Sequence, residues 1–155
     1  MLFRDRLDAG RQLAQALHRY QGKKPLVLAI PRGAVPMAKV VADALQGELD
    51  VVLVRKIGAP SYPEFAVGAV DESGWVYRNP DAGDSPELAR HIAAQRTVAL
   101  ELIRQRRSQY TPGRPPVNPT GRTVIVVDDG LATGSTMIAA LHALRQQQPA
   151  RLVCA

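Results

Sequence analysis

Apolar and polar positions follow one another along this chain in two distinct patterns. Apolar residues between positions 5 and 20 recur at helical spacing, with polar residues between them, which predicts an amphipathic first helix. The runs PLVLAI (25–30) and DVVLVRKI (50–57) are typical of strands buried on both faces. Between these runs, apolar residues from Met37 to Leu45 predict a second helix. The order strand, helix, strand predicts a right-handed βαβ unit with parallel pairing.

The middle of the chain follows a different pattern. Two β-prone stretches, FAVGAV and WVYR, flank the turn-forming residues 71–74, which predicts a hairpin or flap. A Ser-Pro-Glu start signal and apolar residues on one face predict a helix over 85–108. Residues 111–121 hold four prolines and two glycines, which predicts a mobile loop. We therefore expect an insert, at about 65–121, between the second and third strands of the sheet.

The last part of the chain returns to the first pattern. The run TVIVV (123–127) is the most β-branched in the sequence and predicts a central strand. Apolar residues at helical spacing then predict a helix to about residue 148, and RLVCA begins another parallel strand. We therefore expect one α/β domain over residues 1–155, built on an open parallel sheet. The carboxyl ends of the first three strands should lie at one edge of this sheet.

Composition narrows the class of protein. The chain has 155 residues, of which 46% are hydrophobic, which fits one globular domain and excludes a disordered or fibrous protein. No apolar run approaches the ~20 residues that a membrane-spanning helix needs, and charges interrupt the N-terminus too early for a signal peptide. The single cysteine, Cys154, agrees with a reducing compartment. We therefore expect a cytoplasmic protein with no membrane partner.

The formal charge of +6 suits either a nucleic acid or a polyphosphate ligand. Most of the excess lies between residues 85 and 114, where six arginines face two glutamates. The three arginines at the end of the predicted helix, Arg104, Arg106 and Arg107, complement the helix dipole without any ligand. The same cluster could instead clamp a substrate or a nucleic acid, so the sequence disfavours a nucleic-acid partner but leaves it open.

The stretch DDGLATGST, which joins the central strand to the last helix, carries the strongest functional signal. It lies at the carboxyl end of a strand, where ligands of open parallel sheets bind. The N-terminus of the following helix and the hydroxyl groups of Thr133, Ser135 and Thr136 suit a phosphate. The adjacent carboxylates of Asp128 and Asp129 suit hydroxyl groups or a hydrated Mg²⁺. A ribose 5-phosphate combines both features; the alternative is a plain strand-to-helix turn with two solvated aspartates.

Three stretches of the chain together resemble a known family. VIVVDDGLATGST is similar to the 5-phosphoribosyl-1-pyrophosphate (PRPP) signature of type I phosphoribosyltransferases. LAIPRGAVPMA and VLVRKIGAP resemble one group of them, predicted bacterial phosphoribosyltransferases whose base substrate is not established. The resemblance covers nearly the whole chain. It implies an open parallel sheet with helices on both faces, PRPP and a small-molecule base as substrates, Mg²⁺ as cofactor, and a homodimer.

The resemblance also implies roles for individual residues. Asp128 and Asp129 would hold the ribose hydroxyl groups and Mg²⁺, with Asp129 acting through a water of the metal. Arg32 would stabilise the leaving pyrophosphate from the loop after the first strand, and Lys56 from the end of the second. The residues expected at the 5-phosphate are Ala132, Thr133, Gly134, Ser135 and Thr136, and those expected at the pyrophosphate are Arg32, Gly33, Arg55 and Lys56.

The resemblance bears on base specificity as well. Ala132 stands where hypoxanthine-guanine members carry an aspartate. Adenine-type members also carry an alanine at this position. Type I enzymes place part of the hood that recognises the base after the strand on which this sequence ends. We therefore expect the C-terminal hood to be missing or truncated, which leaves the base unidentified.

The favoured function is transfer of a 5-phosphoribosyl group from PRPP to a nitrogenous base, with release of pyrophosphate. Asp128, Asp129, Arg32 and Lys56 are the expected catalytic residues. The alternative is a non-catalytic regulator that binds PRPP or a nucleotide and contacts nucleic acid.

Overall fold

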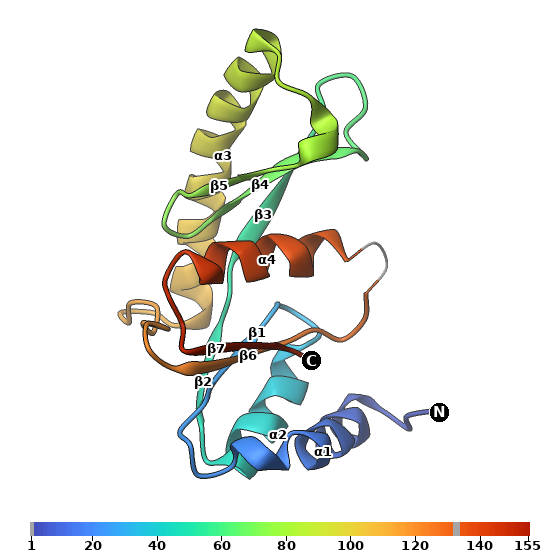
Figure 1. Ribbon diagram of the computed structural model, residues 1–155, viewed down its shortest axis with the longest axis vertical. Helices are drawn as coiled ribbons and strands as arrows, with labels where there is room; N and C mark the ends of the chain where they lie inside the picture. The colour runs from blue at the N-terminus through green and yellow to red at the C-terminus, as the bar shows by residue number, and fades with distance from the viewer. Residues whose placement is uncertain (1, 132–133) are drawn as a thin grey trace. The chain divides into compact units, whose positions relative to one another are not determined.

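The chain folds into two compact units. The computed structural model describes residues 2–131 and 134–155. The first unit comprises Met1–Val52, Pro116–Ala132 and Leu144–Ala155, and the second comprises Leu53–Pro115 and Thr133–Ala143. Figure 1 labels the helices and strands of both.

A parallel sheet forms the centre of the first unit. Its strand order is β2-β1-β6-β7, and all three pairings are parallel. The two inner strands are almost completely buried, which is why they read as continuous apolar runs. The sheet confirms the predicted α/β class. Its strands are β1 (Leu26–Ala29), β2 (Glu48–Val51), β6 (Thr123–Val127) and β7 (Arg151–Cys154).

Two helices of the first unit pack against each other on one side of this sheet (Figure 1). Helix α1 (Arg6–Ala16) begins at Asp5, whose side chain accepts a hydrogen bond from the Asp8 backbone N–H at 2.7 Å. It is followed by a 3₁₀ turn, η1 (His18–Tyr20). Helix α2 (Val35–Leu45) carries a proline in its first turn and ends where Gln46 takes a left-handed conformation.

An antiparallel sheet of three strands forms the second unit together with its helices. The strand order is β3-β4-β5. The predicted hairpin is confirmed: β4 and β5 pair antiparallel around a turn in which the Asp71 carboxylate accepts from both the backbone N–H and the hydroxyl of Ser73. The strands are β3 (Val54–Gly58), β4 (Ala66–Asp71) and β5 (Val76–Arg78).

The long helix α3 (Pro86–Tyr110) packs on β3 and β4. Ser85 caps it by accepting from the Leu88 backbone N–H at 3.1 Å, which confirms the predicted helix start. Ile57, Val67 and Ile92 join Leu88 in the buried core between helix and sheet. The remaining elements that bear on this unit are the 3₁₀ turn η2 (Pro80–Ala82) and helix α4 (Ser135–Arg145).

The run predicted as one strand over 50–57 is divided between the two sheets. β2 ends at Val51 in the parallel sheet, and β3 begins at Val54 in the antiparallel sheet. The apolar pattern continues across the break because Leu53 is also buried, at 3% exposure. A single strand was therefore the wrong prediction, since periodicity reports burial and not the partner strand.

The proline-rich residues 111–121 contain no helix or strand, as predicted. Asp50, which is buried in β2, anchors this loop by accepting from the Val117 backbone N–H at 2.9 Å. Thr120 donates from its hydroxyl to the Gln147 carbonyl at 2.9 Å.

Among the described helices, none has the length and apolar character required to span a membrane.

Arginines of α3 hold the hairpin turn against the helix. Arg107 is buried and makes two hydrogen bonds of 2.7 Å to the Glu72 carboxylate. Arg96 donates from Nε to the Gly74 carbonyl at 2.7 Å. The expectation that Arg107 serves the helix dipole is therefore incomplete, because its guanidinium is engaged with a residue distant in sequence.

Arg107→Ala should destabilise the protein by about 2–3 kcal/mol, because it leaves the Glu72 carboxylate partly buried without its cation. Arg106→Ala removes an exposed arginine from the same turn and should change stability by less than about 0.5 kcal/mol. Urea unfolding followed by circular dichroism measures both. Equal midpoints for the two variants would contradict this account of Arg107.

Candidate functional site

The loops that follow β1 and β6 begin side by side at the carboxyl edge of the parallel sheet. Ala29 pairs with Val127, and the backbone N–H of Ile30 donates to the Val127 carbonyl at 2.9 Å. Ligands of open α/β sheets bind at this edge. The structure thus brings together the loop with Arg32 and the loop with the acidic pair, as the strand pattern predicts.

The acidic pair lies directly after β6. Asp128 is half-buried, and one of its carboxylate oxygens accepts from the Asp129 backbone N–H at 2.8 Å. Burial raises the pKa of the Asp128 carboxyl, the hydrogen bond from the Asp129 backbone opposes this, and the Asp129 carboxylate adds to it. Asp129 has a side chain that is 30% exposed. The pair therefore places two carboxyl groups at the edge of the sheet. Burial makes the ionised form of Asp128 less favourable than it would be in water.

Gly33 allows the two loops to approach each other. A Cβ atom at this position would collide with the Oδ2 atom of Asp129. The peptide bond that precedes Arg32 is cis, and the Arg32 side chain is exposed. Gly33 is therefore required for the position that Asp129 occupies.

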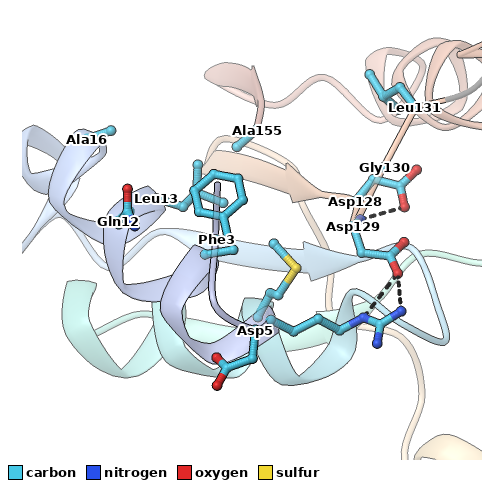
Figure 2. Close-up of a pocket in the computed structure, with 13 residues that line it drawn as sticks. Phe3, Asp5, Gln12, Leu13, Ala16, Asp128, Asp129, Gly130, Leu131 and Ala155 are labelled. Atoms are coloured by element: carbon cyan, nitrogen blue, oxygen red, sulfur yellow. Dashed lines mark hydrogen bonds and ion pairs between the residues drawn. The ribbon is translucent and has the colours of Figure 1, made fainter. Parts of the chain in front are cut away.

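A residue that the sequence did not single out completes this cluster. Arg6, the first residue of α1, donates to the Asp129 Oδ2 atom from Nε at 3.2 Å and from Nη2 at 3.0 Å. Dashed lines in Figure 2 mark these contacts. A cation in the first turn of a helix opposes the helix dipole. This unfavourable position could have drawn attention to Arg6, but it does not identify Asp129 as the partner of Arg6.

A cavity of about 570 Å³ opens beside the acidic pair within the first unit. One part of its wall is apolar, with Leu13 and Phe3 from the N-terminal segment (Figure 2). Another part carries the Asp128 and Asp129 carboxylates (Figure 2). The cavity can thus accept a ligand with hydroxyl groups on one side and an apolar surface on the other.

The other predicted residues lie in the second unit. Arg55 and Lys56 are exposed on β3, where Lys56 pairs with Ala69. Their expected place at the end of the second parallel strand is wrong, because that strand ends at Val51 and the chain then enters the antiparallel sheet.

Lys56 nevertheless lies near a second predicted residue. It lines a cavity of about 130 Å³ together with Ser135, the first residue of α4. Gly134 has a left-handed φ of 76°, and its carbonyl accepts the hydrogen bond of the Ile138 backbone N–H at 2.8 Å. A lysine and a helix N-terminus are both attractive to an anion.

The residues expected at the 5-phosphate are described only in part. Gly134, Ser135 and Thr136 are partly buried around the start of α4. Ala132 and Thr133 lie outside the described residues. Over residues 2–131 and 134–155, no three His, Cys, Asp or Glu side chains are grouped so as to hold a metal ion. A metal at the acidic pair would therefore take other ligands from the substrate or from water.

The chain is similar to known proteins along nearly its whole length. The family model for the phosphoribosyl transferase domain matches residues 3–155. Two curated proteins of Mycobacterium tuberculosis, from strains CDC 1551 and H37Rv, are each 45% identical over 156 residues and carry provisional names as phosphoribosyl transferases. These matches cover 99% of this chain and 35% of each relative, so the chain spans about a third of their length.

Solved structures share the fold. The crystal structure of TT1426 from Thermus thermophilus has 44% sequence identity and a TM-score of 0.86, covering 99% of this chain and 74% of its own. A hypoxanthine phosphoribosyltransferase from Staphylococcus aureus, at 16% identity, has a TM-score of 0.54 and covers 97% of this chain and 61% of its own. A hypoxanthine-guanine phosphoribosyltransferase from Bacillus anthracis, also at 16% identity, has a TM-score of 0.53, covering 97% and 66%. These similarities confirm the expected open-sheet fold.

Asp128→Asn should raise the free energy of unfolding at pH 7 by about 0.5 kcal/mol, because the buried Asp128 carboxylate pays a desolvation cost that an amide does not. Since the folded-state pKa is raised above 3.8, ionisation of Asp128 lowers stability as the pH rises from about 4. The advantage of Asp128→Asn should therefore disappear at pH 3.5. Thermal unfolding at a series of pH values measures it.

Asp129→Asn is the matched control for this prediction. It removes the charge that accepts two hydrogen bonds from Arg6, so it should leave the midpoint at pH 7 unchanged or lower it. A stabilisation by Asp129→Asn equal to that of Asp128→Asn would contradict the burial argument.

Proposed function

The chain belongs to the phosphoribosyl transferase domain family, and from this premise we propose that it transfers a 5-phosphoribosyl group from PRPP to a nitrogenous base. The acidic pair carries the proposal. Asp128 and Asp129 lie at the carboxyl edge of the parallel sheet, next to the loop with Arg32 and beside a cavity. Carboxylates that accept hydrogen bonds there suit the vicinal hydroxyl groups of a ribose.

We assign the two phosphate ends of PRPP to different residues. The 5-phosphate is assigned to residues 132–136, and the start of α4 after Gly134 supports this because helix N-termini bind anions. The pyrophosphate is assigned to Arg32 and Gly33, and to Arg55 and Lys56. All three basic side chains are exposed and so can contact a ligand. Arginine is well suited to bidentate contacts with phosphate oxygens.

Mg²⁺ fits the chemistry of the acidic pair. Carboxylate oxygens are its preferred protein ligands, and it is commonly held by one or two of them together with substrate phosphates. Asp128 and Asp129 are the residues that would hold it, directly or through water. When bound, Mg²⁺ supplies positive charge to the departing pyrophosphate.

The residues of this chain would act by positioning and by charge. The bond between the anomeric carbon and the pyrophosphate oxygen breaks, the oxygen keeps the electron pair, and a nitrogen of the base forms the new bond. Asp128 and Asp129 would fix the ribose, so that the anomeric carbon faces the base. Arg32 and Lys56 would stabilise the negative charge that grows on the leaving group. The proposal also includes a small-molecule base as the second substrate and a homodimer as the assembly.

Asp128→Asn combined with Asp129→Asn should weaken Mg²⁺-dependent PRPP binding at least about 100-fold, because each loses a charged acceptor for the ribose hydroxyl groups. Isothermal titration calorimetry measures it. The matched control is Asp43→Asn, which removes an exposed aspartate that pairs with Lys39 on α2. An unchanged PRPP affinity in the double variant, with intact circular dichroism, would refute the proposed role of the acidic pair.

Pyrophosphate release across a panel of nitrogenous bases, with PRPP and Mg²⁺ present, tests the reaction itself. The proposal predicts release with at least one base and none without a base. The alternative, a non-catalytic regulator, predicts PRPP binding without release. Binding of a nucleic acid that weakens steeply with salt and responds to PRPP would favour the regulator.

A further inference from the structure

The contact between Arg6 and Asp129 alters the charge of the acidic pair. Two neighbouring carboxylates carry a formal charge of −2, and the Arg6 guanidinium reduces this to −1. Arg6 reaches a single oxygen, the Oδ2 atom of Asp129, from both Nε and Nη2. It also lies close to Gly33, since its Nη2 atom is 3.2 Å from the position of a Cβ there. The guanidinium thus lies beside both loops, next to Gly33 and Asp129.

We propose that Arg6 determines which ligands the acidic pair accepts: it admits the neutral hydroxyl groups of a ribose and disfavours a free divalent metal ion. This inference rests on the proposed function, because it concerns the same pair. Under it, the metal enters together with the pyrophosphate of PRPP and does not occupy the pair beforehand. Arg6 is thereby a specificity-determining residue of the first unit.

Hydroxyl groups remain compatible with Arg6. A carboxylate has about four lone-pair positions, so the two N–H groups on Oδ2 leave Asp129 able to accept further hydrogen bonds. A hydroxyl donor carries no net charge and is not repelled by the guanidinium. The same holds at Asp128, where the Asp129 backbone N–H occupies one position of Oδ1.

A free divalent cation meets a different situation. An ion that coordinates Asp129 would lie within a few ångströms of the Arg6 guanidinium, and two positive charges at that distance repel each other. The Arg6 side chain is 62% exposed, so water and salt reduce the repulsion. We therefore expect Arg6 to weaken binding of a free divalent ion by about fivefold.

Arg4 offers a matched comparison on the same segment. It also pairs with an aspartate, Asp8, at 3.5 Å, and its side chain is 84% exposed. The Asp8 side chain is only 13% exposed, and Asp8 does not line the cavity beside the acidic pair. A general loss of positive charge near the N-terminus would therefore affect Arg4 and Arg6 variants alike, whereas the proposed role is confined to Arg6.

The test is a titration with Mn²⁺ in the absence of PRPP, followed by electron paramagnetic resonance of the free ion. Arg6→Gln should bind Mn²⁺ about fivefold more tightly than the unmodified protein. Arg6→Lys keeps the charge and should stay close to the unmodified protein, as should Arg4→Gln. Adding Asp129→Asn to Arg6→Gln should abolish the gain. Circular dichroism of each variant checks folding, and Arg6→Ala provides a second neutral replacement.

Equal Mn²⁺ affinities for Arg6→Gln, Arg6→Ala and the unmodified protein would overturn the inference, as would a gain of the same size in Arg4→Gln. These outcomes do not depend on PRPP. A parallel titration with PRPP tests the proposed function separately: the difference between Arg6→Gln and the unmodified protein should shrink, because the metal then arrives with the pyrophosphate. If the gain appears without PRPP but PRPP leaves it unchanged, the role of Arg6 stands and the PRPP site is wrong.

Discussion

The parallel pairing of β1 with β6 is the constraint on which the candidate site depends. Both strands are buried, and their register aligns Ala29 with Val127, the last residues of the two strands. The loops that follow β1 and β6 therefore leave the sheet from adjacent positions. This pairing makes the loop with Gly33 and the loop with Asp129 neighbours. Burial of two apolar strands thus fixes the position of polar groups that are far apart in the sequence.

The sequence predicted the elements whose signal is local. Strands with continuous apolar runs, the hairpin at residues 71–74, and the helix that Ser85 caps all appear where the pattern places them. It did not predict the change of sheet after Val51, because burial of Leu53 continues the apolar pattern while the partner strand changes. Strand partners are a property of the tertiary structure, which periodicity does not encode.

The candidate site was predictable to a similar degree. The motif from Asp128 onward signals its chemistry by residue type, and the predicted parallel pairing places the carboxyl ends of the strands at one edge of the sheet. Arg6 was not predictable, since its contact with Asp129 joins residues 123 positions apart. The same is true of Arg107 and Glu72, which are 35 positions apart. Part of the positive charge of the insert is thus paired within the second unit, as Arg107 is with Glu72. This pairing weakens the argument from charge for a nucleic-acid partner.

The close approach of Gly33 to Asp129 makes two distant positions depend on each other. Any side chain at position 33 would take the volume that the Oδ2 atom of Asp129 now occupies. A larger residue at 33 is therefore compatible only with a smaller or displaced side chain at 129. Substitutions at the two positions should show epistasis, and the two loops can diverge in sequence only in a coordinated way.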